Sequence, residues 1–175
     1  MKVGLFGGSF NPPHQGHLHI NNLAIKKLGL QQIWWIPTAH NPFKEKSIYE
    51  NYEARYKKCE NLTKNHPKIY LKKFDEIKTE KLIKKLQKKY PNYQFIWIMG
   101  ADNLPRFHEW DNFKNLIKML PFAIFSRDNF LAKISQTKSF KIYSKLQSSD
   151  QKFPQFFRLR TKTVNISSTN LRKNV

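Results

Sequence analysis

Cysteine is almost absent from this 175-residue chain, since Cys59 is its single copy. One thiol cannot form an internal disulfide or supply the thiolates of a cysteine-rich zinc site, so both frameworks are excluded. Long apolar runs are also missing, and no stretch approaches the ~20 residues that a helix needs to span a bilayer. The N-terminus carries Lys2 and only a short apolar strand, which is not the pattern of a signal peptide. We therefore expect a cytoplasmic protein with no membrane partner.

Acidic residues are scarce as well. The chain has 12 Asp and Glu against 32 Lys and Arg, which gives a formal net charge of +20 at pH 7. Such an excess is typical of proteins that bind nucleic acid, but it also arises when lysines cover solvated surfaces. Lysines occur in nearly every segment, and no module that reads RNA or DNA is recognisable. We therefore expect no nucleic-acid partner, while part of the charge can still attract anionic nucleotides.

Apolar runs and helical patterns alternate along the chain. The 39% hydrophobic and 14% aromatic content favours a folded core, and the length favours one domain over residues 1–175. The apolar runs predict strands at 2–6, 32–36, 69–74, 94–99, 122–125 and 156–164, with a weaker pattern at 140–143. The helical patterns lie at 16–28, 50–65, 79–90, 113–119 and from 166 onward. This order predicts an α/β fold, a doubly wound parallel sheet of about five to six strands with flanking helices.

The loop after the first strand carries the strongest functional signal. It reads Gly7-Gly8-Ser9-Phe10-Asn11-Pro12-Pro13-His14-Gln15-Gly16-His17. Glycines let backbone amides approach a ligand, and the helix that follows presents its positive end to anions. His14 and His17 stand three residues apart at that helix start. Their spacing is compatible with phosphate binding, with metal ligation, and with packing or capping.

Ligands of open α/β sheets bind at the carboxyl ends of the strands, so two further loops should lie near the first. Lys44 stands in the loop at 38–44, where its position alone distinguishes it from other lysines. Asp102 follows the fourth strand and can accept ribose hydroxyls or anchor its loop. Trp110 can stack on a flat ring or pack in the core.

A second anion-binding pattern lies near the C-terminus. Ser167-Ser168-Thr169 opens the last predicted helix, and Arg172 follows one turn later. Hydroxyls and free amides gather at such a helix start, and the arginine side chain leans back toward it. An ordinary helix cap with a surface arginine gives the same pattern.

Together, four segments resemble the bacterial nicotinate-mononucleotide adenylyltransferase family. Gly8 to His17 resembles the (T/H)-x-G-H nucleotidyltransferase signature in its G-S-F-N-P-x-H-x-G-H form. Ile166 to Arg172 is similar to the family's I-S-S-T-x-I/L-R element, and Ile98 to Leu104 with Trp110 to its I-x-G-x-D-x-L…W segment. Ile36 to Lys44, with Arg55 downstream, fits the same family, and all four occur in family order.

The resemblance implies a Rossmann-like fold of the HUP nucleotidyltransferase type and an adenylyl transfer from ATP to nicotinate mononucleotide, with Mg²⁺ bound through the ATP phosphates. It implies no covalent enzyme intermediate and no metal ligand from the protein. It assigns catalysis to His14, His17 and Arg172. It assigns ATP binding to Gly7, Gly8, Ser9, Phe10, His14, His17, Gly100, Asp102, Ile166, Ser167, Ser168 and Arg172. It assigns mononucleotide binding to Lys44, Thr79, Asp102 and Trp110.

Three alternatives stay open beside this interpretation. Nicotinamide mononucleotide or phosphopantetheine would be the acceptor of a related adenylyltransferase, and a basic RNA-associated α/β protein would be no enzyme. Thr79 lies in Lys78-Thr79-Glu80-Lys81-Leu82, which departs from the family's Y-T-x-x-T-L. The sequence leaves the oligomeric state open, a homo-oligomer included.

Overall fold

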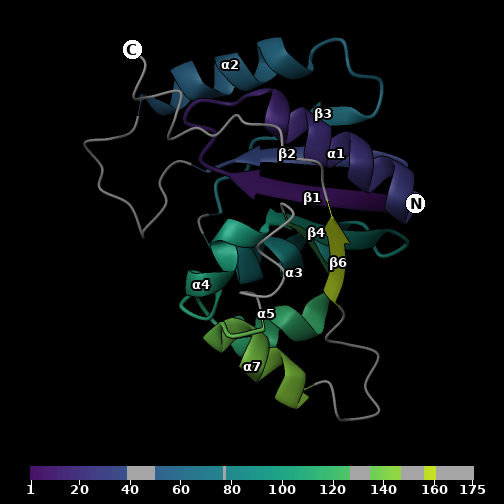
Figure 1. Ribbon diagram of the computed structural model, residues 1–175. Coiled ribbons are helices and arrows are strands. Elements are labelled where there is room, and N and C mark those ends of the chain that lie inside the picture. The colour runs from purple at the N-terminus through teal and green to yellow at the C-terminus, as the bar shows by residue number, and fades with distance from the viewer. Residues whose placement is uncertain (39–49, 77, 127–134, 147–155, 161–175) are drawn as a thin grey trace. The chain divides into compact units, whose positions relative to one another are not determined.

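The structure of this chain is a computed structural model that describes residues 1–38, 50–76, 78–126, 135–146 and 156–160 (Figure 1). These residues form two compact units. The N-terminal unit lies within residues 3–76, and the C-terminal unit comprises residues 78–160 together with Met1 and Lys2. Whether they act as one domain stays a prediction.

The N-terminal unit consists of strands alternating with helices. Its elements are β1 (Lys2–Gly8), α1 (Gln15–Leu28), β2 (Gln32–Pro37), α2 (Tyr52–Thr63) and β3 (Ile69–Leu71). The strands are parallel and lie in the order β3-β2-β1, with Val3 opposite Gln32 and Gly8 opposite Pro37. Figure 1 shows α1 and α2 on the same side of β1 and β2. Leu5, Ile33 and Trp35 are fully buried, so the apolar runs of these strands form the core of the unit.

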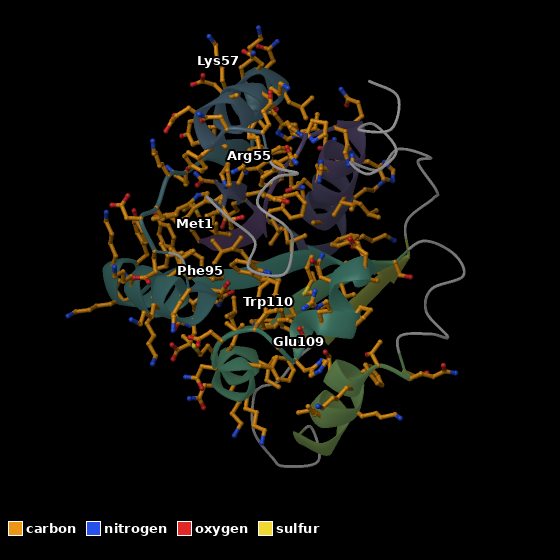
Figure 2. All side chains as sticks on the ribbon, turned by 90° about the vertical axis from the view of Figure 1, so that its left-hand side faces the viewer. Met1, Arg55, Lys57, Phe95, Glu109 and Trp110 are labelled. Carbon is orange, nitrogen blue, oxygen red and sulfur yellow. The ribbon has the colours of Figure 1, made fainter. Side chains whose placement is uncertain are left out.

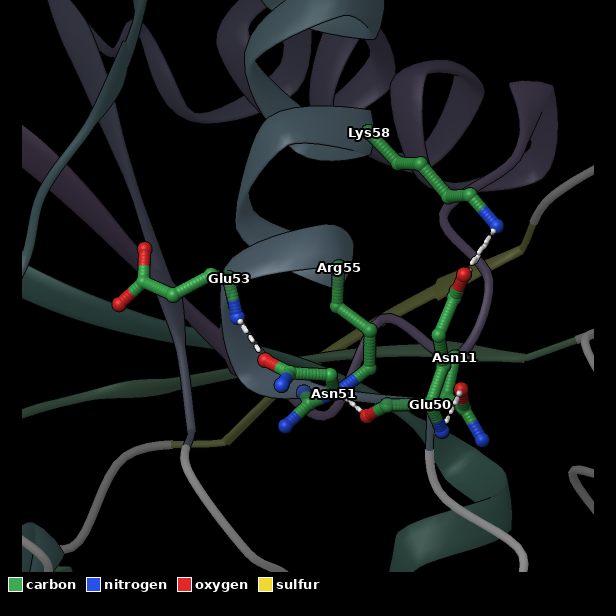
Figure 3. A network of polar contacts seen from close by, with 6 residues as sticks. All are labelled: Asn11, Glu50, Asn51, Glu53, Arg55 and Lys58. Atoms are coloured by element: carbon green, nitrogen blue, oxygen red, sulfur yellow. Dashed lines mark hydrogen bonds and ion pairs between the residues drawn. The ribbon is translucent and has the colours of Figure 1, made fainter.

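Local sequence determines where both helices of this unit begin and end. The α1 helix ends at Gly29, whose φ of +62° is the left-handed conformation that glycine adopts at little cost. The Gly29 N–H then donates to the carbonyl oxygen of Ile25. At the start of α2, the side chain of Asn51 accepts a hydrogen bond from the N–H of Glu53 over 2.9 Å, a typical N-cap (Figure 3).

The C-terminal unit contains three more parallel strands. Its elements are α3 (Thr79–Lys89), β4 (Gln94–Gly100), η2 (Ala101–Asn103), α4 (Leu104–Phe107), α5 (Phe113–Met119), β5 (Phe122–Ser126), α7 (Lys138–Leu146) and β6 (Phe156–Arg160). Its strands lie in the order β4-β5-β6. The amphipathic pattern of α3 is confirmed, because Leu82, Ile83 and Leu86 are buried. Met1 is tied to the start of β4, where the N–H of Gln94 donates to its carbonyl oxygen over 2.8 Å.

The structure confirms the six main strands and corrects one prediction. Residues 140–143 were expected to form a strand, but they lie within helix α7. Ser139 accounts for the difference, because it is fully buried and its hydroxyl bonds to the backbone of α4 and of the residue that follows it. The short helices η2 and α4 were not expected, and the helix predicted from residue 166 onward lies outside the described residues. Within the described ranges, no helix is long and apolar enough to span a bilayer.

Candidate active site

Hydrogen bonds join the carboxyl ends of β1 and β2. Thr38 comes directly after β2 and donates two hydrogen bonds to the carbonyl oxygen of Gly8. Its backbone N–H lies 2.9 Å from that oxygen and its hydroxyl 3.3 Å. These two bonds fix the position of Gly8, after which the loop with Ser9 and Phe10 begins. This is the edge of a parallel sheet at which ligands bind.

Phe10 holds this loop in an uncommon conformation. Its φ of +46° lies in the left-handed region, which is unfavourable for a residue with a side chain. Its ring is buried, with 3% of the residue exposed, and stacks on Trp35 at a centroid distance of 4.6 Å. Burying a Phe side chain contributes about 1.5–3 kcal/mol, which offsets the roughly 1–3 kcal/mol that such a backbone conformation costs. The loop is thus fixed by packing as well as by hydrogen bonds.

His14 and His17 are brought together at the start of α1. His14 is the N-cap residue, and its N–H donates to Nδ1 of His17 over 3.1 Å. The N–H of His17 donates in turn to the carbonyl oxygen of His14 over 2.9 Å. Because Nδ1 of His17 accepts a hydrogen bond, the ring of a neutral His17 carries its proton on Nε2. His17 therefore offers an N–H donor on the atom farthest from the backbone.

His17 stays neutral over the physiological range. The pKa of His17 is lowered from 6.5 to about 3, first by burial and then by the neighbouring His14, while a hydrogen bond to the His14 backbone partly opposes both effects. Its ring lies among aromatic rings, 5.2 Å from that of Phe10 and 6.0 Å from that of Trp35. A neutral imidazole donates one hydrogen bond to a phosphate oxygen without first having to lose or gain a proton.

Asn21 connects this histidine to the sheet and was not singled out from the sequence. It is fully buried on α1, and its side-chain N–H donates to the carbonyl oxygen of His17 over 2.6 Å. Its side-chain oxygen accepts a hydrogen bond from the indole N–H of Trp35 over 3.2 Å. An asparagine on the apolar face of a helix, one turn after a histidine, is the sequence signal that could have identified it.

In the C-terminal unit, Gly100 and Asp102 lie where β4 ends. Gly100 is the last residue of the strand and Asp102 lies in η2, with its carboxylate exposed. The side-chain amide of Asn103 donates to the carbonyl oxygen of Gly100 over 3.3 Å, which closes the turn. Asp102 is therefore exposed just beyond the strand end, and its contact with a ribose stays a prediction.

Trp110 packs against the core and also borders a cavity. Its ring meets Trp97 and Phe107 edge to face, at centroid distances of 6.1 and 5.1 Å. The cavity has a volume of about 480 Å³ and is lined by His108, Trp110, Phe113, Lys114 and Lys138, together with Asn112 and Ile142. The structure thus shows the packing of Trp110, while stacking of its ring on a ligand stays a prediction.

The residues on either side of Thr79 contact the segment that follows Trp110. Thr79 is the first residue of α3, after Lys78. The ammonium group of Lys78 lies 3.3 Å from the carboxylate of Asp111, and Glu80 accepts a hydrogen bond from the side chain of Asn112 over 3.2 Å. Two contacts therefore hold the start of α3 beside the segment that follows Trp110.

Comparison with known proteins decides the family. A family model described as cytidylyltransferase-like matches residues 5–174. A protein of Agrobacterium fabrum named probable nicotinate-nucleotide adenylyltransferase is 36% identical over 187 aligned residues, which cover 99% of each chain. The chain belongs to this adenylyltransferase family. A Ruegeria relative of the same name is 36% identical over 82% of this chain and 77% of its own.

Solved structures support the fold of this adenylyltransferase. The nicotinic acid mononucleotide adenylyltransferase of Plasmodium falciparum, complexed with NaAD, aligns with a TM-score of 0.75 at 22% identity. The same protein complexed with APC aligns with a TM-score of 0.73, and each alignment covers 98% of this chain and 82% of the other. The predicted Rossmann-like nucleotidyltransferase fold is thereby confirmed.

The predicted site residues that the structure describes are divided between the two units. The N-terminal unit brings together Gly7, Gly8, Ser9, Phe10, His14 and His17, and the C-terminal unit contains Thr79, Gly100, Asp102 and Trp110. Lys44, Ile166, Ser167, Ser168 and Arg172 lie outside the described residues. Within the described ranges, no group of three or more His, Cys, Asp or Glu side chains is arranged to hold a metal ion.

Proposed function

We propose that this protein transfers the adenylyl group of ATP to nicotinate mononucleotide and releases pyrophosphate. An oxygen of the mononucleotide phosphate forms a bond to the α-phosphorus of ATP. The bond from that phosphorus to the bridging oxygen of the β-phosphate breaks, and the electron pair leaves with pyrophosphate. The product is nicotinate adenine dinucleotide, an intermediate of NAD biosynthesis.

The observation that carries this proposal is the hydrogen bond from the His14 N–H to Nδ1 of His17. It supports a fixed Nε2–H donor beside a glycine-rich loop and a helix N-terminus, both of which favour anions. Phosphoryl and nucleotidyl transfer ask the protein mainly to position its substrates and to stabilise developing negative charge. A neutral histidine with a fixed tautomer is suited to that task.

The other roles follow from position at the strand ends. Gly7, Gly8, Ser9 and Phe10 are proposed to place backbone amides around the ATP phosphates. Asp102 is proposed to accept hydrogen bonds from a ribose, with Gly100 giving it room. Trp110 is proposed to lie against the pyridine ring, with Thr79 near the nicotinate carboxylate.

Further roles are proposed for five residues outside the described ranges. Lys44 would add positive charge near the mononucleotide. Ser167, Ser168 and Arg172 would hold the triphosphate, with Arg172 stabilising the transition state and Ile166 beside them. Each follows from the motif match and from the chemistry of hydroxyl and guanidinium donors.

Mg²⁺ is proposed to bind through the phosphate oxygens. The described residues around the first loop supply imidazole, hydroxyl and amide groups, which fits a metal held by ATP better than one held by carboxylates. The ion would neutralise charge on the triphosphate as pyrophosphate leaves. The protein would act as a cytoplasmic enzyme, with substrates rather than macromolecules as its partners.

A single assay tests the acceptor. The protein is incubated with ATP and Mg²⁺ and with nicotinate mononucleotide, nicotinamide mononucleotide or phosphopantetheine, and pyrophosphate release is measured. We expect the largest kcat/KM with the nicotinate compound. No release with that acceptor would overturn the proposal, and a higher kcat/KM with another acceptor would reassign the substrate.

A further inference from the structure

Arg55 is a buried cation. It comes from α2, and only 1% of its surface is exposed, whereas arginine is almost never fully buried unless its donors are satisfied. Figure 2 shows Arg55 on the inner side of this helix and Lys57 on the outer side. From the sequence, Arg55 has only a place in the family pattern and no role of its own. The hydrogen-bond acceptors of this guanidinium show which segments it holds together.

Its nitrogen atoms donate to three segments of the N-terminal unit. Nη1 donates to the carbonyl oxygen of Ser9 and to that of Thr38, the latter over 3.0 Å. Nε donates to the carbonyl oxygen of Glu50 over 2.9 Å (Figure 3). Ser9 belongs to the loop after β1, Thr38 follows β2, and Glu50 precedes α2. One guanidinium therefore joins the loops of two neighbouring strands.

A second set of contacts fixes the same junction. The N–H of Glu50 donates to the side-chain oxygen of Asn11 over 3.2 Å, and Asn11 is 5% exposed. The carboxylate of Glu50 lies 2.7 Å from the ammonium group of Lys58 (Figure 3). The peptide groups on both sides of Glu50 are thus held, one by Asn11 and the other by Arg55. The loop after β1 is tied to α2 at two points.

The contact to Ser9 has a consequence for the ligand side of the loop. The carbonyl of Ser9 and the N–H of Phe10 belong to one planar peptide group and point in opposite directions. Because the carbonyl points at Arg55, the N–H of Phe10 points away from it. Phe10 stands between the glycines and the histidines that are proposed to bind phosphate. Arg55 thereby determines where that N–H is presented.

We infer that Arg55 is a positioning residue for the adenylyl transfer, which orients the Ser9–Phe10 peptide and holds the strand-end loops of β1 and β2 in register. It acts through Ser9 and Thr38 and does not touch the substrate. This inference rests on the proposed function for its kinetic readout. It requires the planar fork of arginine, because a lysine ammonium at this site cannot hold Ser9, Thr38 and Glu50 in the same geometry.

The test compares Arg55→Lys and Arg55→Met with the matched control Lys57→Ala. Lys57 is exposed on the same helix, so its replacement also removes one positive charge. Misplacing a catalytic loop by about 1 Å costs roughly 10²-fold in rate, so we expect R55M to lower kcat by about that factor. R55K keeps the charge and should still lower kcat by about tenfold. K57A should stay within about twofold of the wild type, as a distant surface change does.

Folding and positioning are separated by two further measurements. Circular dichroism gives the thermal midpoint of each variant, and kinetics are run well below the lowest midpoint. Added methylguanidinium should raise kcat of Arg55→Ala, whereas methylammonium at equal concentration should not. The inference is overturned if folded R55K has a kcat within twofold of the wild type, if neither cation or both cations rescue, or if R55K does not fold.

A binding measurement distinguishes failure of this inference from failure of the proposed function. A wild-type protein that releases no pyrophosphate with nicotinate mononucleotide would contradict the proposed function alone. Calorimetric titration with a non-hydrolysable ATP analogue needs no acceptor and still reports on the loop. We expect R55K to weaken binding of the analogue at least about threefold, because the Phe10 N–H is no longer aligned. Unchanged affinity in R55K would overturn the role of Arg55 whatever the acceptor.

Discussion

A side chain added to Gly100 would occupy the space of the Asp102 carboxylate. An ideal Cβ built on Gly100 overlaps Oδ1 of Asp102, while the next nearest atom, Cγ of the same residue, lies 3.5 Å away. The glycine is therefore what allows the carboxylate to fold back over the end of β4. Asp102 is exposed, so its side chain can move aside at little cost in stability.

Replacing Gly100 with alanine should consequently affect binding more than folding. We expect Gly100→Ala to raise the KM for at least one nucleotide substrate about tenfold, because the displaced carboxylate loses a charge-assisted hydrogen bond worth about 1.5–3 kcal/mol. Steady-state kinetics with each substrate varied in turn measure the effect. The matched control is Asp102→Asn, which keeps the shape and should show the same substrate dependence. A G100A enzyme with wild-type KM values would remove Asp102 from the site.

The Nε2–H of His17 should be the part of its ring that matters. We expect His17→Ala to lower kcat by about 10²–10³, the usual loss for one donor that stabilises a developing charge. Glutamine places an N–H near the position of Nε2, so His17→Gln should retain more activity than His17→Ala. Single-turnover measurements separate this chemical step from product release. If the kcat of H17A lay within about tenfold of the wild type, His17 would contribute less than ~1.4 kcal/mol to lowering the activation free energy.

The lowered pKa of His17 also predicts how stability depends on pH. The pKa is about 3 in the folded chain and 6.5 in a model peptide, so the unfolded chain binds more protons between these values. Stability should therefore fall as pH decreases below 6.5. This single group should account for roughly 2 kcal/mol of loss between pH 6.5 and pH 5.0.

Urea unfolding at several pH values measures this dependence, with H17Q as the comparison. Glutamine does not titrate, so H17Q should lose less stability than the wild type over the same interval. Parallel curves for the two proteins would show that His17 does not carry the effect. The slopes decide the matter, because a constant offset between the curves reports only on packing.

The strands and the loop after β1 were predictable because their signals are local. The run from Gln94 to Met99 is apolar throughout, and β4 forms there with one more residue. The interval at 113–119 matched α5 at both ends. In each case the apolar pattern of neighbouring residues determines the element, and the buried residues follow the same pattern.

The supports of the site were not predictable, since their partners lie far along the chain. Arg55 and its acceptor Ser9 are 46 positions apart, and Asn21 and Trp35 are 14 positions apart. Phenylalanine does not prefer the left-handed backbone conformation that Phe10 adopts, and stacking of its ring on Trp35 stabilises that conformation. Such features depend on which segments the fold brings together, and no local pattern reports that.

Helix α7 is the clearest example of tertiary contacts deciding a local structure. Phe140 and Ile142 alternate with polar residues over a short stretch, which is why a strand was expected there. In the structure, the hydroxyl of Ser139 donates to the carbonyl oxygen of Leu104 over 2.6 Å and accepts a hydrogen bond from the N–H of His108 over 2.9 Å. Both bonds tie the start of α7 to α4 and the residue after it.

Removing this hydroxyl should therefore destabilise the protein. Ser139→Ala leaves the carbonyl of Leu104 and the N–H of His108 without this partner in a buried place, and an unsatisfied buried polar group costs about 1–3 kcal/mol. We expect urea titrations to show a fall of about 1–3 kcal/mol or more in the free energy of unfolding. Lys141→Ala is the control, because Lys141 is exposed on the same helix and should change stability by less than about 0.5 kcal/mol. If S139A proved as stable as K141A, the hydroxyl would not be what holds α7 in place.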